Sequence, residues 1–207
     1  MRLKPILKCV YSLLMPGTFI VFEGPDGAGT TTHARLLAER LRSKGKDVLL
    51  TAEPTDGPIG QQIRSHLKIH DSINPMELQK LFVEDRAWHL EQVILPALER
   101  ETIVISDRYI PSTLIYGSSL GLPLEELQEL NKKFIQADVT IFTLPPFETC
   151  WARVAKRAER DSFEREELQR KIYDAYVKMA KEDPRIHVID TSREKDAVAK
   201  EISALLP

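Results

Sequence analysis

The first residues whose types suggest chemistry form a short glycine-rich segment near the N-terminus. Its spacing approaches the phosphate-binding pattern G-x-x-x-x-G-K-[ST], in which glycines let a phosphate come close to backbone N–H groups. Thr30 stands at the position of the lysine, so one expected positive charge is absent. The segment reads Gly24-Pro25-Asp26-Gly27-Ala28-Gly29-Thr30-Thr31-Thr32.

The sequence on either side of this segment supports a phosphate-binding role. Residues 18–23 form an apolar run typical of a buried parallel strand, and a helical period follows the segment until Gly45. A strand, a glycine loop and a helix together direct backbone N–H groups and a helix N-terminus at an anion. A plain turn between a strand and a helix is the alternative interpretation.

Further strand-like and helix-like segments alternate along the chain, which predicts one three-layer α/β domain with a five-stranded parallel sheet flanked by helices. In such folds ligands bind beyond the carboxyl ends of the strands. The expected strands are 18–23, 47–52, 102–106, 139–144 and 185–189, and the expected later helices are 75–95, 124–137, 148–158, 163–181 and 195–206.

Bulk properties exclude several classes of protein. The 207 residues carry a formal net charge of −2, which gives no basic field for polymeric nucleic acid. No apolar stretch is long enough to cross a bilayer. Cys9 and Cys150 have no metal-ligand spacing and are interpreted as reduced thiols of a cytoplasmic protein.

Residues 1–15 are interpreted as an N-terminal extension and residues 16–207 as a single domain. Basic residues before a short apolar group faintly resemble a signal peptide, but no small-residue cleavage site follows. Met15 lies just before Pro16-Gly17 and the first expected strand, and it offers a second possible translation start.

Two further groups of residues could bind a nucleotide. Asp107 and Arg108 follow the third expected strand, where an NTPase places a carboxylate for Mg²⁺ and where an arginine can grip a phosphate. A surface ion pair is the alternative. Phe82 and Arg86 lie four residues apart on one expected helix, so they share a face and could stack on a base and bond its carbonyl. A core phenylalanine and a solvated arginine would give the same pattern.

Taken together, these segments resemble those of thymidylate kinases, from the first strand nearly to the C-terminus. The segment Asp107-Arg108-Tyr109-x-x-Ser112-x-x-x-Tyr116 is the most specific match. The others are Phe22-Glu23-Gly24-x-Asp26-Gly27-x-Gly29, Glu53-Pro54, and Leu81-Phe82 with Asp85-Arg86-Ala87 and His89. The resemblance implies a P-loop nucleoside monophosphate kinase fold and transfer of the ATP γ-phosphate to dTMP with Mg²⁺, in a homodimer.

The resemblance also implies roles for individual residues. Residues 24–32 would bind ATP, with Thr31 and Asp107 at the Mg²⁺ ion. The dTMP site would comprise Asp26 at the sugar hydroxyl and acceptor phosphate, Phe82 stacked on thymine, Arg86 at its carbonyl, Arg108 at the acceptor phosphate, Tyr116 against the sugar, and Glu53 and Ser112 from the matched segments.

A mobile lid is implied at about residues 153–164. Because the residue after Asp26 is Gly27 and not arginine, the resemblance implies that the catalytic arginine lies in the lid, with Arg153, Arg157 and Arg160 as candidates. A solvated helix end is the alternative interpretation of each arginine taken singly.

The chain departs from the family pattern at three positions. Thr30 replaces the lysine of the phosphate loop, Ala52 replaces the arginine often found before the Glu-Pro pair, and Gly117 stands where many bacterial members have glutamine after Tyr116. Losing one preorganised donor costs about 2.7–4 kcal/mol in a transition state. We hypothesise that the lid arginines partly replace the missing ammonium group. A kinase for another nucleoside monophosphate such as dUMP, or a catalytically silent nucleotide-binding protein, remains the alternative function.

Overall fold

The computed structural model describes residues 15–69, 73–157, 163 and 165–206. Within them, five strands form one sheet in the order β2-β3-β1-β4-β5, and every neighbouring pair is parallel. The strands are β1 Phe19–Glu23, β2 Val48–Ala52, β3 Ile103–Asp107, β4 Val139–Thr143 and β5 Ile186–Ile189. The predicted fold class is therefore confirmed, and most of the predicted N-terminal extension lies outside the described residues.

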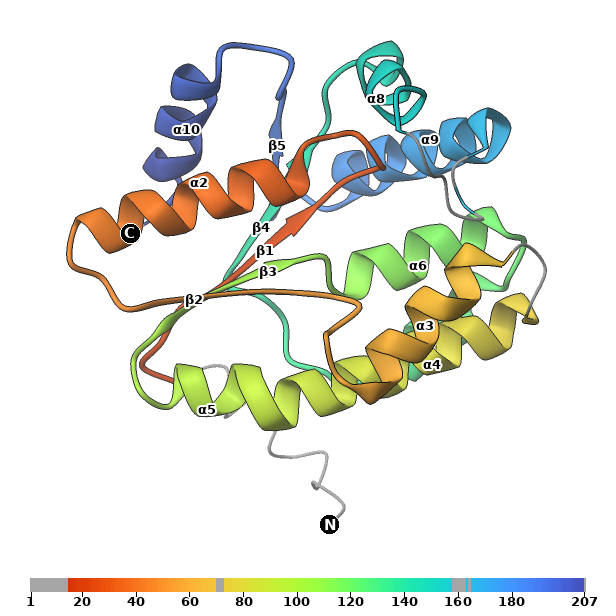
Figure 1. The fold of residues 1–207 in the computed structure, drawn as a ribbon, viewed down its shortest axis with the longest axis horizontal. Coiled ribbons are helices and arrows are strands. Elements are labelled where there is room, and N and C mark those ends of the chain that lie inside the picture. Colours follow the sequence, from red (N-terminus) through yellow and green to blue (C-terminus); the bar gives the residue numbers. More distant parts are fainter. Residues whose placement is uncertain (1–14, 70–72, 158–162, 164, 207) are drawn as a thin grey trace.

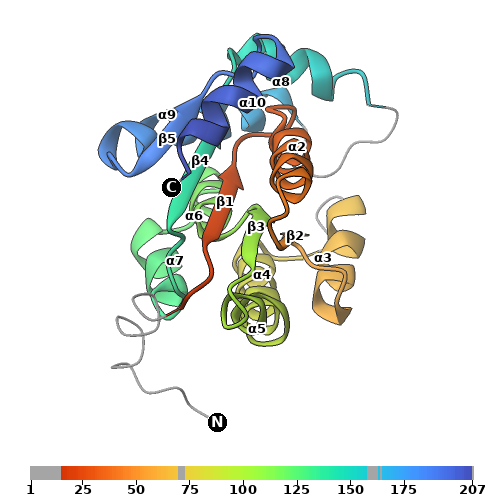
Figure 2. The same cartoon turned by 90° about the vertical axis from the view of Figure 1, so that its left-hand side faces the viewer.

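The central strand β1 explains why the domain has three layers. Successive side chains of a strand point to opposite faces, and every residue of β1 is buried. Ile20 and Phe22 pack into one apolar cluster, beneath α2 (Thr30–Ser43) and α10 (Lys195–Ala204). Phe19 and Val21 pack into a second cluster on the opposite face. Figure 2 shows α2 and α10 together on one side of the sheet.

The remaining helices cover that second face and the carboxyl edge of the sheet, as Figure 1 shows. A π-helical turn, η1, joins α4 to α5, so the helix expected over 75–95 has a change of winding after His89. The elements are α3 Pro58–Lys68, α4 Pro75–His89, η1 Leu90–Ile94, α5 Leu95–Leu98, α6 Ile110–Ser119, α7 Leu124–Asn131, α8 Phe147–Val154 and α9 Glu166–Glu182.

Two of these helices, α3 and α6, were not predicted from the sequence. Each has a proline within its first two positions, where the missing N–H costs nothing because it would have no helical partner. The prolines and Gly57 instead read as loop signals. Gly60 of α3 is required because a Cβ there would lie 1.9 Å from the Thr55 carbonyl oxygen.

No helix in the described part of the chain is long and apolar enough to cross a membrane. Cys150 on α8 is a buried free thiol, and burial raises its pKa to about 12. It is therefore a packing residue and not a nucleophile at neutral pH.

Candidate active site

The glycine-rich segment forms a loop between β1 and α2, as expected. Gly27 and Gly29 have φ values of 77° and 92°, which favour glycine. A Cβ on Gly27 would also lie 2.3 Å from the Cys150 carbonyl oxygen. Because α2 begins at Thr30, the first N–H groups of the helix face the inside of the loop without helical partners.

Neighbouring side chains hold the loop carbonyls turned away from that interior. Arg153 donates from Nη1 to the Gly27 carbonyl over 3.0 Å and from Nη2 to the Thr191 carbonyl over 3.2 Å. The Thr191 hydroxyl in turn donates to the Ala28 carbonyl over 2.5 Å. Because these carbonyls already accept hydrogen bonds from side chains, they do not compete for the backbone N–H groups at the start of α2. Those N–H groups can bind an anion, so the loop fits a nucleotide phosphate.

Arg153 also brings a positive charge to the place where Thr30 brings none. Thr30 is buried, and the Nη1 atom of Arg153 lies 3.8 Å from a Cβ built on Gly29. Of the other two predicted lid arginines, Arg157 follows the end of α8 in an exposed turn, and Arg160 lies outside the described residues.

Asp107 and Thr31 meet where the resemblance expects the metal. The Thr31 hydroxyl donates to Oδ2 of Asp107 over 2.5 Å. The other carboxylate oxygen of Asp107 is buried and has no hydrogen-bond partner among the described residues. Mg²⁺ commonly uses one or two protein oxygens and completes its shell with phosphates and water, so a free carboxylate oxygen beside a hydroxyl fits it.

Arg108 and Asp26 form an ion pair between the phosphate loop and the helices beyond it. Arg108 Nη2 donates to Asp26 Oδ1 over 2.6 Å, and Nη1 donates to the Gly24 carbonyl and the Ser112 hydroxyl, each over 3.1 Å. The backbone of Arg108 has a φ of 75°, which is strained for a residue with a side chain. Such strain is concentrated at functional sites.

The second carboxylate oxygen of Asp26 is also bonded. It accepts from the Tyr116 hydroxyl over 3.1 Å and from Gln169 Nε2 over 2.7 Å. Gln169 lies on α9 and was missed from the sequence, because a glutamine on an amphipathic helix gives no sign that it faces a carboxylate far away in the chain.

Glu23 at the end of β1 is a second missed residue. One carboxylate oxygen accepts from the backbone N–H groups of Tyr109 and Ser112, and the other accepts from the Ser112 and Tyr176 hydroxyls over 2.7 and 2.8 Å. Burial raises the pKa of Glu23, although Arg108 and these hydrogen bonds oppose the rise. Glu23 thereby fixes the start of α6, which carries Ser112 and Tyr116.

A cavity of about 140 Å³ opens beside the Asp26–Arg108 pair. Five of the predicted substrate residues line it: Asp26, Phe82, Arg108, Ser112 and Tyr116. Side chains from the segment after β2, from α3, α4 and α6, and from the segment before α9 complete its wall. The other lining residues are Pro54, Leu67, Gln79, Thr113 and Phe163.

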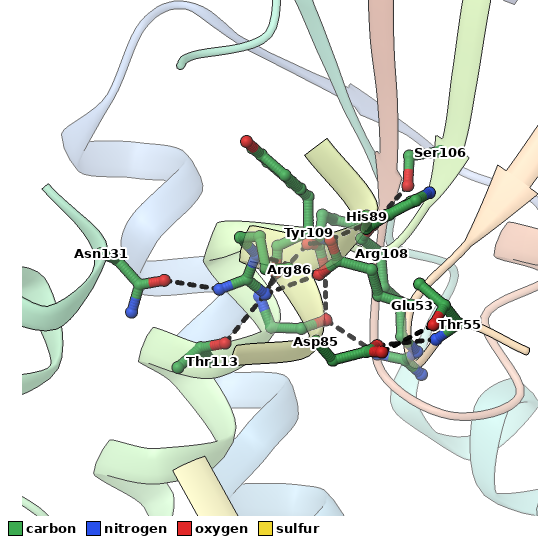
Figure 3. A network of polar contacts seen from close by, with 12 residues as sticks. Glu53, Thr55, Asp85, Arg86, His89, Ser106, Arg108, Tyr109, Thr113 and Asn131 are labelled. Atoms are coloured by element: carbon green, nitrogen blue, oxygen red, sulfur yellow. Dashed lines mark hydrogen bonds and ion pairs between the residues drawn. The ribbon is translucent and has the colours of Figure 1, made fainter. Parts of the chain in front are cut away.

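Glu53 and Arg86, the other two predicted substrate residues, do not line this cavity. Arg86 is 1% exposed and donates to Glu53 over 2.9 Å, to Asn131 over 2.5 Å and to Thr113 over 3.0 Å (Figure 3). Glu53 also contacts His89 over 3.1 Å. A direct contact of Arg86 with a base stays a prediction that this geometry does not support.

The fold and the site define a class of protein. A phosphate loop, a carboxylate at the end of the neighbouring strand β3 and a polar cavity beyond it are the parts of a P-loop kinase that acts on a nucleoside monophosphate.

Comparison with known proteins identifies the family within that class. The family model described as thymidylate kinase matches residues 22–202. The chain is 38% identical over 198 residues to the probable thymidylate kinase of Pyrococcus abyssi, and the match covers 93% of this chain and 97% of the relative. It is 37% identical to the probable thymidylate kinase of Thermococcus kodakarensis, with 91% and 96% covered. For the thymidylate kinase of Ectopseudomonas mendocina the identity is 39%, with 93% and 96% covered. The chain belongs to the thymidylate kinase family.

Proposed function

We propose that this protein transfers the γ-phosphate of ATP to dTMP, giving dTDP and ADP. The observation that carries the proposal is the Asp26–Arg108 pair, which joins the phosphate loop to the cavity. A donor phosphate in the loop and an acceptor in the cavity would both lie within reach of Arg108. The names of the relatives support dTMP as the acceptor.

The acceptor end of this site is built to fix a phosphate and a sugar. Arg108 would bind the acceptor phosphate, because a guanidinium group makes paired bonds to phosphate oxygens. Asp26 would orient Arg108 and accept a hydrogen bond from the sugar hydroxyl. Phe82 would stack on the base, with the Tyr116 ring against the sugar and Ser112 completing the wall.

The donor end would bind ATP on residues 24–32 and Mg²⁺ on Thr31 and Asp107. A metal held by these two residues would supply positive charge that neutralises the donor phosphates. The attacking atom is an ionised phosphate oxygen of dTMP, so no residue has to remove a proton from it. Catalysis by this chain then consists of positioning two anions in line and stabilising the charge between them.

Arg153 is the described residue best placed to replace the charge that Thr30 lacks. Its guanidinium already lies on the loop and needs only to turn from the Gly27 carbonyl toward a phosphate. Arg157 and Arg160 stay candidates from the sequence.

We further propose that residues 16–207 act as one kinase domain with a lid at about 153–164. We also propose that the enzyme is cytoplasmic and homodimeric; light scattering tests the dimer.

A coupled assay of ADP release tests the proposed activity. The purified protein is given Mg-ATP and a panel of dTMP, dUMP, dCMP, dGMP and dAMP. We expect the highest kcat/KM with dTMP. A preference for another monophosphate would replace the proposed acceptor, and nucleotide binding without turnover would leave a silent binding protein.

A further inference from the structure

Arg108 has to leave the direction of β3 in order to reach the acceptor cavity. Alternate residues of a strand face the same side, so an extended Arg108 would share the face of Ser106 and Val104, on which the second apolar cluster lies. Its φ of 75° turns the chain instead, and the guanidinium group meets Asp26 and the Ser112 hydroxyl at the cavity. The left-handed conformation therefore brings Arg108 to its proposed place.

This conformation is unfavourable for an arginine. Only glycine adopts the left-handed region readily, with asparagine and aspartate next, because a Cβ atom there comes too close to the following carbonyl oxygen. Glycine at this position would remove the guanidinium group that the proposed function needs. Strained residues persist where the structure around them fixes their backbone, so the contacts of the Arg108 backbone are part of the site.

Three hydrogen bonds fix the two peptide groups of Arg108. Its N–H group donates to the Phe22 carbonyl over 2.8 Å. Its carbonyl accepts from the Ser106 hydroxyl over 2.8 Å (Figure 3). The next N–H group, that of Tyr109, donates to the Glu23 carboxylate over 2.8 Å. The bond from Ser106 is the one that a neutral side chain makes, so it can be removed without changing the charge of the site.

The position of Ser106 in the sheet makes its hydroxyl informative. The residue is fully buried in β3, and it pairs with Val21 of β1 and Thr51 of β2. The three residues before it in the strand are apolar. A hydroxyl group in such a layer costs free energy unless it is hydrogen-bonded, and alanine would continue the apolar strand without that cost. The hydroxyl is therefore explained by the bond that it makes to the Arg108 carbonyl.

From these contacts we infer that Ser106 is a positioning residue for phosphoryl transfer: its hydroxyl holds the Arg108 backbone in the left-handed conformation and thereby places the guanidinium group for the acceptor phosphate. The inference rests on the proposed function and adds to it a residue that is buried and touches neither nucleotide. Without the hydroxyl, the Arg108 backbone relaxes and the guanidinium group moves. The acceptor then loses its phosphate contact and keeps its contacts at the sugar and the base.

Replacing Ser106 with alanine tests the inference. Ser106→Ala removes the hydroxyl, and Ser106→Thr keeps it on a residue type that strands favour. Ser203→Ala is the control, because the Ser203 hydroxyl on α10 makes the same kind of bond, to the Ala199 carbonyl over 2.6 Å. Calorimetry measures the Kd for dTMP, for thymidine and for ATP, and the coupled assay gives kcat and KM. Thymidine lacks the phosphate that Arg108 would bind.

We expect Ser106→Ala to raise the Kd and KM for dTMP about 5- to 20-fold and to lower kcat about 10- to 100-fold, because a displaced guanidinium group loses both binding and alignment. The Kd for thymidine and for ATP should stay within about twofold of wild type, as should all values for Ser203→Ala. Ser106→Thr should recover most of the loss.

Two further measurements separate positioning from a general loss of stability. In a protein that already carries Arg108→Met, adding Ser106→Ala should change the Kd for dTMP less than about twofold, because Ser106 acts through Arg108. The Tm of ligand-free Ser106→Ala should stay within about 3 °C of wild type, because the released backbone strain offsets the lost hydrogen bond.

The inference is overturned by any of three results. If Ser106→Ala keeps the wild-type Kd for dTMP and the wild-type kcat, the hydroxyl does not position Arg108. Equal weakening of dTMP, thymidine and ATP, with a fall in Tm well beyond that of Ser203→Ala, would make Ser106 a structural residue. Additive effects of Ser106→Ala and Arg108→Met on dTMP binding would mean that Ser106 acts on another group.

The wild-type protein separates this inference from the proposed function. If wild type neither binds nor phosphorylates dTMP, the proposed function fails and the role of Ser106 fails with it. An active wild type with an unaffected Ser106→Ala variant refutes only the role of Ser106.

Discussion

Replacing Arg86 with methionine should destabilise the fold far more than a usual single substitution. The Arg86 and Glu53 side chains are 1% and 3% exposed, and once the guanidinium is gone Glu53 keeps the His89 imidazole as its ion-pair partner within the part of the chain that the structure describes. Removing one member of a buried ion pair costs about 3–5 kcal/mol. For a chain of this size, that free energy corresponds to a fall in Tm of roughly 6–20 °C.

Urea unfolding of the ligand-free protein, followed by circular dichroism, measures this loss. Arg35→Met on α2 is the control, because Arg35 is exposed and its pair with Glu39 spans 3.5 Å; we expect a change below about 0.5 kcal/mol there. The double variant Glu53→Gln/Arg86→Met should lose less free energy of unfolding than the two single variants lose in total. We expect the difference to be at least about 1 kcal/mol, because the two residues are coupled.

The opposite pattern would refute the reasoning. If Arg86→Met unfolds within about 1 kcal/mol of wild type and raises the KM for dTMP at least 100-fold, Arg86 acts mainly on the base. If the losses of unfolding free energy in the two single variants add up to the loss in the double variant, Glu53 and Arg86 do not stabilise each other.

Three further predictions concern the phosphate loop and its surroundings. Thr30→Lys should keep activity, because the loop and the acceptor site are otherwise complete; complete inactivation in the coupled assay would mean that the pocket is rebuilt around the smaller side chain. Arg153→Ala should lower kcat about 10²- to 10³-fold if Arg153 replaces the missing lysine; a loss of only a few-fold would place the compensating charge elsewhere. His33 on α2 has its pKa lowered from 6.5 by burial and by the positive charges of Arg153 and Lys195. The unfolded chain then takes up a proton below about pH 6.5 that the folded chain refuses, so stability should fall as the pH drops through that value. Between pH 7.5 and 5.5 the Tm of His33→Gln should fall less than the Tm of wild type. An equal fall in both proteins would assign the pH dependence to other groups.

The sequence predicts the sheet and the glycine loop well because each depends on local signals. Apolar runs identify all five strands, and the glycines identify the loop. Helices α3 and α6 escape prediction because their prolines read as loops, although proline suits the start of a helix.

Within the site, the residues directly after strands or within the loop fall where the spacing predicts. Phe82 and Tyr116, inside helices, also line the cavity as expected, but other helical side chains around the site are missed. A period of 3.6 residues gives the face of a helix but not what lies opposite it, so Gln79 and Gln169 are missed. Arg86 is assigned to the base by its helical spacing from Phe82; in the structure it donates to the Thr113 hydroxyl and does not line the cavity, so its contact with a base stays a prediction.

The most direct test of the central claim is to identify the product formed from dTMP and Mg-ATP by chromatography. The account predicts that wild type forms dTDP and ADP in equal amounts, and that Arg108→Met, which removes the group proposed to bind the acceptor phosphate, forms dTDP about 10²- to 10³-fold more slowly with ATP binding intact. No dTDP from a wild-type protein that binds both nucleotides, or undiminished turnover by Arg108→Met, would contradict it.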